Sequence, residues 1–158
     1  MTWGNPPKFV NVDKPPAKKV TPEQLAKSGS EDGMQAALFC WAAEASVTGF
    51  PQLKWLFAVP NGGQRHIAEA TKLVATGTRS GVPDVFLPAP IRLYPDFSYH
   101  GCWIEMKIER HRSRKNGGLS DEQIEWRDYL LSAGYYWAVC YSWIEAKNVL
   151  IAYLEGKV

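Results

Sequence analysis

Apolar positions recur along this chain in two patterns, which predict helices and short buried strands. In four segments the apolar residues are three or four positions apart, the spacing of one helix face. Four short apolar runs, most of them bounded by Gly or Pro, predict strands. The predicted helices are residues 30–48, 65–76, 120–133 and 142–153, and the predicted strands are 55–59, 85–87, 102–107 and 136–141.

The predicted elements follow the order helix, strand, helix, strand, strand, helix, strand, helix. This order predicts an α/β domain of three layers, in which helices flank a mixed central β-sheet. The length of 158 residues suits one domain with a single core. Hydrophobic residues make up 46% of the chain and charged residues 22%, which is typical of a globular protein.

Residues 1–29 differ in composition from the rest, because they are rich in proline and lysine. The pairs Pro6-Pro7 and Pro15-Pro16 favour extended backbone. We therefore expect an arm that lies on the surface or is partly disordered, followed by one domain over residues 30–158. The arm would contact DNA phosphates or a partner subunit, or serve only as a solubilising tail.

The three cysteines, Cys40, Cys102 and Cys140, lie in apolar stretches and lack the spacing of zinc ligands. Buried reduced thiols favour a reducing, intracellular location such as the cytoplasm. The N-terminus has no apolar run of the kind that forms a signal peptide. No stretch approaches the length of a membrane span, so we expect no membrane partner.

Charged residues converge where the strands 85–87 and 102–107 begin and end. If these strands pair as a hairpin, Asp84 and Glu105 come to one place. Glu105 and Lys107 are two residues apart on a strand, so their side chains point to the same face. Two adjacent carboxylates repel each other unless a cation lies between them. The pattern therefore predicts a hard divalent ion with Lys107 beside it.

Two helix starts carry further polar candidates. Ser30 is a predicted N-cap, and Glu31 after it is either ordinary first-turn acidity or a third carboxylate near the metal. Ser120 and Gln123 form a predicted capping box. That box gives Gln123 a sufficient structural role without catalysis.

Net charge is only +2, so the distribution of charge is more informative than its sum. Residues 107–115 hold five Lys or Arg against one Glu, which suits an anionic polymer or simply a solvated loop. A glycine pair at 62–63 frees backbone to approach a ligand, although a turn and helix start explain it equally. The candidate DNA-binding residues are Arg110, Arg112, Arg114 and Lys115 in the loop, with Asn61 and Arg65 near the glycine pair.

The succession of these motifs resembles the VRR-NUC family, a branch of the PD-(D/E)XK nucleases. The resemblance covers about residues 30–154 and favours the standalone, virus- or phage-type members. The Val-Arg-Arg of the family name is not matched, because the stretch there is Gly77-Thr78-Arg79-Ser80-Gly81. The matching segments are Ser30-Glu31 with Gln35, Val59-Pro60-Asn61-Gly62-Gly63 with Arg65, Gly81-Val82-Pro83-Asp84, Ile104-Glu105-Met106-Lys107, and Leu119-Ser120 with Gln123.

The resemblance implies a restriction-endonuclease-like fold and a role for each matching residue. Asp84 and Glu105 would be ligands of Mg²⁺, for which Mn²⁺ would substitute, with the Met106 backbone carbonyl as a third. Glu31 would lie near the metal, directly or through water. Lys107 would orient the attacking water and stabilise the charge that develops on phosphate. Gln123 would support the site.

The implied function is a metal-dependent, structure-selective DNA endonuclease that hydrolyses phosphodiester bonds as a dimeric Holliday-junction resolvase. One chain carries one site, whereas a four-way junction needs two symmetric cuts, so a homodimer fits this substrate. Flap, nicking and restriction-like endonucleases are the rival enzymes. A DNA-binding protein that lost the chemistry is a rival of another class, against which the intact Asp84, Glu105 and Lys107 argue.

Overall fold

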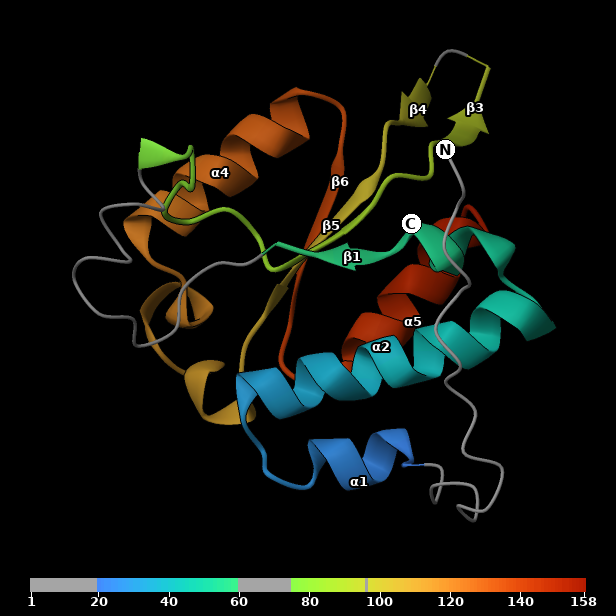
Figure 1. Ribbon diagram of the computed structural model, residues 1–158. Helices are drawn as coiled ribbons and strands as arrows, with labels where there is room; N and C mark the ends of the chain where they lie inside the picture. Colours follow the sequence, from blue (N-terminus) through green and yellow to red (C-terminus); the bar gives the residue numbers. More distant parts are fainter. Residues whose placement is uncertain (1–19, 60–74, 96) are drawn as a thin grey trace, which may run out of the picture.

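The computed structural model describes residues 20–59, 75–95 and 97–158 (Figure 1). Serine side chains cap three of its helices, as their sequences predict: Ser30, Ser120 and Ser142 each accept a hydrogen bond from a backbone N–H in the first turn. The elements in chain order are α1 (Pro22–Ala26), α2 (Glu31–Thr48), η1 (Pro51–Trp55), β1 (Phe57–Ala58), β2 (Val85–Leu87), β3 (Ile91–Tyr94), β4 (Phe97–Tyr99), β5 (Cys102–Met106), η2 (Glu109–His111), η3 (Lys115–Gly118), α4 (Asp121–Ser132), β6 (Tyr136–Cys140) and α5 (Trp143–Leu154).

The main sheet is mixed, with strand order β1-β2-β5-β6. β1 and β5 both pair with β2 in antiparallel fashion, and β5 pairs with β6 in parallel. In Figure 1, α2 and α5 lie below the sheet and α4 lies above it. The predicted fold class, a three-layer α/β domain with a mixed sheet flanked by helices, is confirmed.

Alternation along β5 divides its residues between the two faces of the sheet. Cys102, Ile104 and Met106 are buried in the core with residues of α2 and α5. Trp103 and Glu105 consequently point to the opposite face, where α4 lies. The three cysteines are free, and Cys102 and Cys140 are fully buried as predicted, whereas Cys40 is only half-buried. No described helix is both long and apolar enough to cross a membrane.

Two local predictions about strands were incomplete. The strand predicted over residues 55–59 begins only at Phe57. Trp55 instead ends the 3-10 helix η1, which starts at Pro51 and buries Leu53. A second sheet, the hairpin β3–β4, was not predicted. Pro88 follows the last residue of β2, and Pro90 and Pro95 flank β3. These prolines do not prevent residues 91–94 from pairing with residues 97–99.

The range that we expected to form an extended arm ends in a helix. Thr21 caps α1 in a capping box with Gln24, and Pro22 occupies the first turn, where its missing N–H costs nothing. Leu25 of α1 packs against the core. Residues 1–19, Asn61, Arg65 and nearly all of the predicted helix 65–76 lie outside the described residues.

Candidate active site

The strands β2 and β5 bring the two predicted carboxylates together. Val85 of β2 lies opposite Ile104 of β5 in antiparallel register. The same register places Asp84 opposite Glu105, one step further along the pair. Alternation directs both side chains to the face of the sheet that α4 covers.

Asp84 is fixed by the neighbouring strand. Its Oδ2 accepts a hydrogen bond of 2.8 Å from the backbone N–H of Met106, and its carbonyl accepts one of 2.8 Å from Val59. Burial raises the pKa of the Asp84 carboxyl, although the Met106 hydrogen bond and the Lys107 charge oppose this effect. The carboxylate is thus desolvated and held in one orientation.

Glu105 is only 1% exposed, which is unusual for a carboxylate. Its Oε1 lies 2.8 Å from Lys107 Nζ and also accepts a hydrogen bond from Gln123 Nε2. Its Oε2 is buried and has no hydrogen-bond partner among the described residues. Burial, followed by the charge of Asp84, raises the pKa of Glu105 to about 8, and Lys107 offsets this only in part.

Lys107 is buried to 9% exposure, and its backbone N–H donates to the Cys140 carbonyl at 2.8 Å. That hydrogen bond continues the β5–β6 pairing and fixes the backbone position of Lys107, from which its side chain projects. A lysine buried against a carboxylate differs from the solvated lysine that is common at strand ends.

Gln123 links α4 to the carboxylates. Its Oε1 accepts from the Ser120 backbone N–H at 3.0 Å, which completes the predicted capping box. Its Nε2 donates to Glu105 in the same conformation. Gln123 therefore forms the predicted capping box and also contacts Glu105.

Glu31 is the first residue of α2 and lies at the rim of the site. Its Oε1 is 3.4 Å from His111 Nδ1, and its side chain is 43% exposed. Its charge contributes to the raised pKa of both Asp84 and Glu105, so it lies within electrostatic reach of them.

These side chains line one cavity of about 410 Å³, which we call the carboxylate pocket. The segment 78–82 forms a wall that sequence reasoning did not include. The described lining residues are Glu31, Thr78, Arg79, Ser80, Gly81, Val82, Asp84, Glu105, Lys107 and Gln123.

The pocket offers donors that suit a hard divalent ion. No group of three or more His, Cys, Asp or Glu at metal-binding distances occurs among the described residues. Asp84 and Glu105 nevertheless converge, and the buried Glu105 Oε2 lacks a protein partner among those residues. Mg²⁺ needs only one or two carboxylates besides water and phosphate, so this donor set fits it. The Met106 carbonyl, the predicted third ligand, belongs to the residue that holds Asp84.

The basic loop after β5 is more structured than its composition indicates. Arg112 donates to both oxygens of Glu109 and to Glu145 Oε1, and its guanidinium lies 4.2 Å from the Tyr141 ring centroid. That side chain ties the loop to α5 and is engaged within the protein. In contrast, Arg110, Arg114 and Lys115 form no ion pair with any described residue.

Among solved structures, this chain is similar to a VRR_NUC domain protein. The TM-score is 0.59 at 22% sequence identity, and the match covers 79% of this chain and 88% of the other. No protein-family model and no curated protein matches the sequence. The chain therefore shares the α/β fold of that VRR_NUC domain protein, as the resemblance in its sequence predicted.

Proposed function

We propose that this chain is a metal-dependent DNA endonuclease of the VRR-NUC family. The observation that carries the proposal is the buried Glu105, which faces Asp84, contacts Lys107 at 2.8 Å and keeps one carboxylate oxygen without a partner among the described residues. Burying a carboxylate oxygen without a partner is costly, and a divalent ion at Oε2 would supply the partner that Lys107 does not. The fold shared with a VRR_NUC domain protein supports the proposal.

Asp84 and Glu105 would hold Mg²⁺ or Mn²⁺, with the Met106 carbonyl and, directly or through water, Glu31 as further ligands. Bound there, the ion would neutralise phosphate oxygens and lower the pKa of a bound water. Gln123 and Lys107 both contact Glu105 Oε1, whereas Oε2 has no partner among the described residues. Oε2 is therefore the oxygen that would bind the ion. The residues of this chain thus fix the orientation of the ligand before substrate arrives.

Lys107 supplies fixed positive charge next to the reacting phosphate. In hydrolysis a water oxygen attacks phosphorus, the bond to the leaving oxygen breaks, and negative charge grows on the phosphate. An ammonium held 2.8 Å from Glu105 is positioned to orient that water and to stabilise that charge. Because the side chain is buried, water screens its charge little.

The surroundings of the pocket suit a DNA backbone. Arg110, Arg114 and Lys115 lie on the loop that follows β5 and have no ion-pair partner among the described residues. Contacts of this kind bind phosphate without reading sequence. Asn61 and Arg65 are proposed as further phosphate contacts on the basis of the sequence alone.

We propose in addition that the enzyme acts as a homodimer on four-way junctions, inside the cell. Each chain has one carboxylate pocket, and a C₂ dimer relates two pockets as the strands of a junction are related. Phe57 of the edge strand β1 is 46% exposed, and Trp55 at the end of the preceding helix η1 is 64% exposed. These two side chains offer apolar surface to a second copy. The free cysteines suit a reducing compartment.

A cleavage and binding experiment tests this proposal. Wild type is expected to cut a four-way junction in Mg²⁺, and to cut it faster than a flap or plain duplex. Asp84→Asn should abolish cutting and weaken Mn²⁺ binding in calorimetry, whereas Asp128→Asn, an exposed carboxylate on α4, should change neither. Equal Mn²⁺ affinity in wild type and Asp84→Asn, or no cutting of any DNA by wild type, would refute it.

A further inference from the structure

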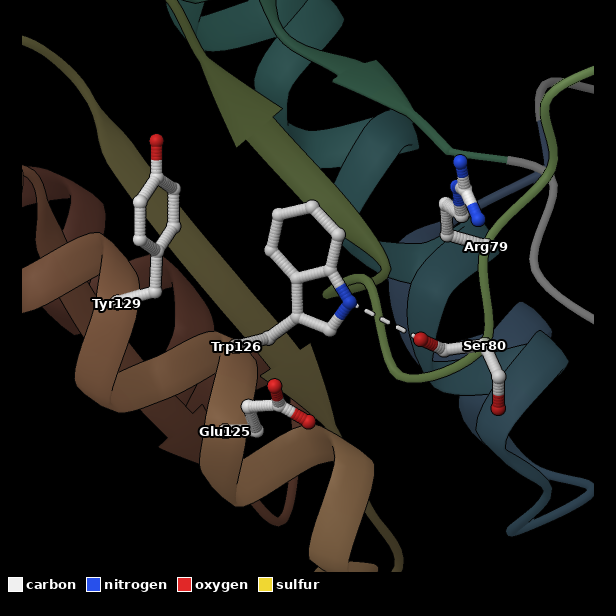
Figure 2. Close-up of a pocket in the computed structure, with 5 residues that line it drawn as sticks. All are labelled: Arg79, Ser80, Glu125, Trp126 and Tyr129. Carbon is white, nitrogen blue, oxygen red and sulfur yellow. Dashed lines mark hydrogen bonds between the residues drawn. The ribbon is translucent and has the colours of Figure 1, made fainter.

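A second pocket adjoins the carboxylate pocket and plays no part in the chemistry above. It has a volume of about 480 Å³ and lies between α4 and the segment 79–80 (Figure 2). Arg79 and Ser80 line both pockets, so the two pockets share the segment 79–80 as a common wall. We call it the aromatic pocket, and its described lining residues are Arg79, Ser80, Glu125, Trp126 and Tyr129.

The two walls of the aromatic pocket are joined by specific contacts. The indole Nε1–H of Trp126 donates to the Ser80 carbonyl at 3.0 Å, which orients the ring (Figure 2). Next to it, Gly81 has φ +80°, and a Cβ at that residue would lie 2.6 Å from the Glu122 backbone carbon. The segment 79–81 therefore packs tightly on the first turns of α4. The pocket is preformed, which lowers the entropic cost of filling it.

Aromatic surface is the main feature of this pocket. Trp126 and Tyr129 are three residues apart on α4, with ring centroids 6.2 Å apart and planes at 83°. Trp126 is half-buried, whereas Tyr129 is 61% exposed. Among the described residues, the buried core includes neither ring, so both rings are available to a planar ligand.

The polar groups of the pocket indicate what kind of planar ligand fits. Arg79 and Glu125 are both exposed at its rim, and among the described residues neither has an ion-pair partner. The carboxylate of Glu125 would repel a phosphate group. It would instead accept hydrogen bonds from an exocyclic amine of a nucleobase, while Arg79 donates to base acceptors or to the flanking phosphate.

We propose that the aromatic pocket binds one unpaired nucleobase of the DNA strand whose phosphate lies in the carboxylate pocket. This inference rests on the proposed nuclease function. The base stacks on the ring of Trp126 and is contacted from the side by Tyr129, whose ring is nearly perpendicular to that of Trp126. Glu125 and Arg79 contact the edge of the base. Only a base that has left the duplex stack reaches such a surface, so the pocket selects distorted or branched DNA over plain duplex.

Binding of three DNAs tests the inference, with Ca²⁺ in place of Mg²⁺ to suppress cleavage. The first is a duplex with one unpaired 2-aminopurine, the second has an abasic residue in that position, and the third is fully paired. Wild type should bind the first about 5- to 150-fold more tightly than the other two, the range expected for stacking of one base. The 2-aminopurine fluorescence should be quenched on binding.

Protein variants locate the effect. Trp126→Ala should lose the preference for the unpaired base over the abasic residue, Trp126→Phe should keep most of it, and Tyr129→Ala should reduce it. Tyr94→Ala, which removes an exposed tyrosine (69%) from β3, is the matched control and should behave as wild type. If Trp126→Ala fails to fold, two measurements still test the inference. One is the comparison of the base with the abasic residue in wild type, and the other is the Tyr129→Ala variant, which should fold because Tyr129 is exposed.

The outcomes separate this inference from the proposed function. Wild type that binds and cuts DNA but does not distinguish the base from the abasic residue overturns the inference and leaves the nuclease standing. A preference that survives unchanged in Trp126→Ala and Tyr129→Ala also overturns it, because the base would then bind elsewhere. Wild type that neither binds nor cuts any of the DNAs refutes both.

Discussion

Glu105 is the residue on which the chemistry of the site depends. Its two oxygens have different surroundings: Oε1 is close to Lys107 and Gln123, and Oε2 has no partner among the described residues. Desolvation outweighs the attraction of Lys107, so the pKa of Glu105 rises to about 8. Near neutral pH the metal-free protein therefore holds a proton that a metal ion would displace.

The raised pKa predicts how stability depends on pH in the absence of metal. Glu105 has a pKa of about 8 in the folded protein against an ordinary value of 4.5, so between these values the folded state binds more protons than the unfolded state. Its contribution to the free energy of unfolding is therefore present below pH 4.5 and falls as pH rises toward 8, by about 1 kcal/mol per pH unit.

Urea denaturation in EDTA at pH 5, 6.5 and 8 measures this effect. Glu105→Gln keeps the shape of the side chain but cannot titrate, so stability should fall less steeply with pH in the variant than in wild type. The difference between the two curves isolates Glu105 from other titrating groups. Parallel curves would show that the carboxyl is not desolvated in solution.

At the level of single residues, the sequence predicted the features that depend on near neighbours in the chain, such as which side chains share a strand face. Glu105 and Lys107 share a face of β5 because of strand alternation, which the sequence pattern contains. Asp84 lies opposite Glu105 because of the β2–β5 register, which the sequence analysis assumed and the structure supplies. The contact between Gln123 and Glu105 depends on how α4 docks on the sheet, which no local pattern specifies. The pairing of Arg112 with Glu145, 33 residues away, has the same cause.

At the level of elements, the close contact between the segment 79–81 and α4 holds the site together. Gly81→Ala should break this contact, because φ is +80° and the new Cβ would meet the Glu122 backbone at 2.6 Å. We expect a loss of about 1–3 kcal/mol in the free energy of unfolding. Cleavage should fall as well, since Asp84 lies three residues further on.

Gly49→Ala is the matched control for that variant. Gly49 follows α2 with φ −167°, an extended value open to any residue, and nothing lies within 4 Å of the position that a methyl group would take there. Chemical denaturation and cleavage rates of the two variants should differ clearly. Equal stabilities would show that the segment does not pack on α4 as described.

The basic loop is an element whose arginines have different roles. Replacing Arg110, Arg114 and Lys115 with Gln should weaken binding to all DNA sequences alike and reduce the slope of log K against log salt by roughly one unit for each lost phosphate contact. Arg112→Gln should instead lower stability, because its guanidinium pairs with Glu109 and Glu145.

Fluorescence anisotropy of labelled DNA, measured over roughly a sixfold range of salt from about 50 to about 300 mM, gives the slope of log K against log salt. Arg92→Gln, which removes an exposed arginine from β3, is the control and should leave the slope unchanged. A triple variant with the slope of wild type would show that the loop is solvated in the complex.

The elements themselves were predictable where their signals were strong. Helices with a serine cap and strands with a continuous apolar run were found, whereas β1 and the hairpin β3–β4 were missed or misplaced. β1 has only two residues, and β3 alternates half-buried and exposed positions between prolines. The aromatic pocket was missed because it joins α4 to a segment more than 40 residues earlier, although two aromatic residues three apart on a polar helix were a signal.

At the level of the whole molecule, we predict a homodimer that cuts four-way junctions in pairs. Light scattering at micromolar concentration should give twice the mass of the chain. In a cleavage assay, both symmetric strands of a junction should be cut within one binding event. Replacing the exposed Trp55 with Ser should weaken the dimer if this edge of the sheet forms the interface. A monomer that cuts flaps and junctions equally would contradict the resolvase proposal without affecting the hydrolytic site.

The fold alone does not establish the activity. The likeness to a VRR_NUC domain protein rests on a shared architecture at 22% identity, and one fold can support several chemistries. The catalytic claim depends on the carboxylate pocket, and within it Lys107 is the residue whose role differs most between a nuclease and a structural protein. Its removal is therefore the most direct test.

That test is single-turnover cleavage of a four-way junction by Lys107→Ala at saturating enzyme and Mg²⁺. Loss of a charge that acts in the transition state should lower the rate by about 10²–10³-fold while DNA affinity and folding are largely retained. Lys157→Ala, which removes an exposed lysine paired with Glu155, should cut at the rate of wild type. A Lys107→Ala protein that is folded and cuts within a few-fold of wild type would contradict the catalytic role of Lys107 and, with it, the proposed nuclease site.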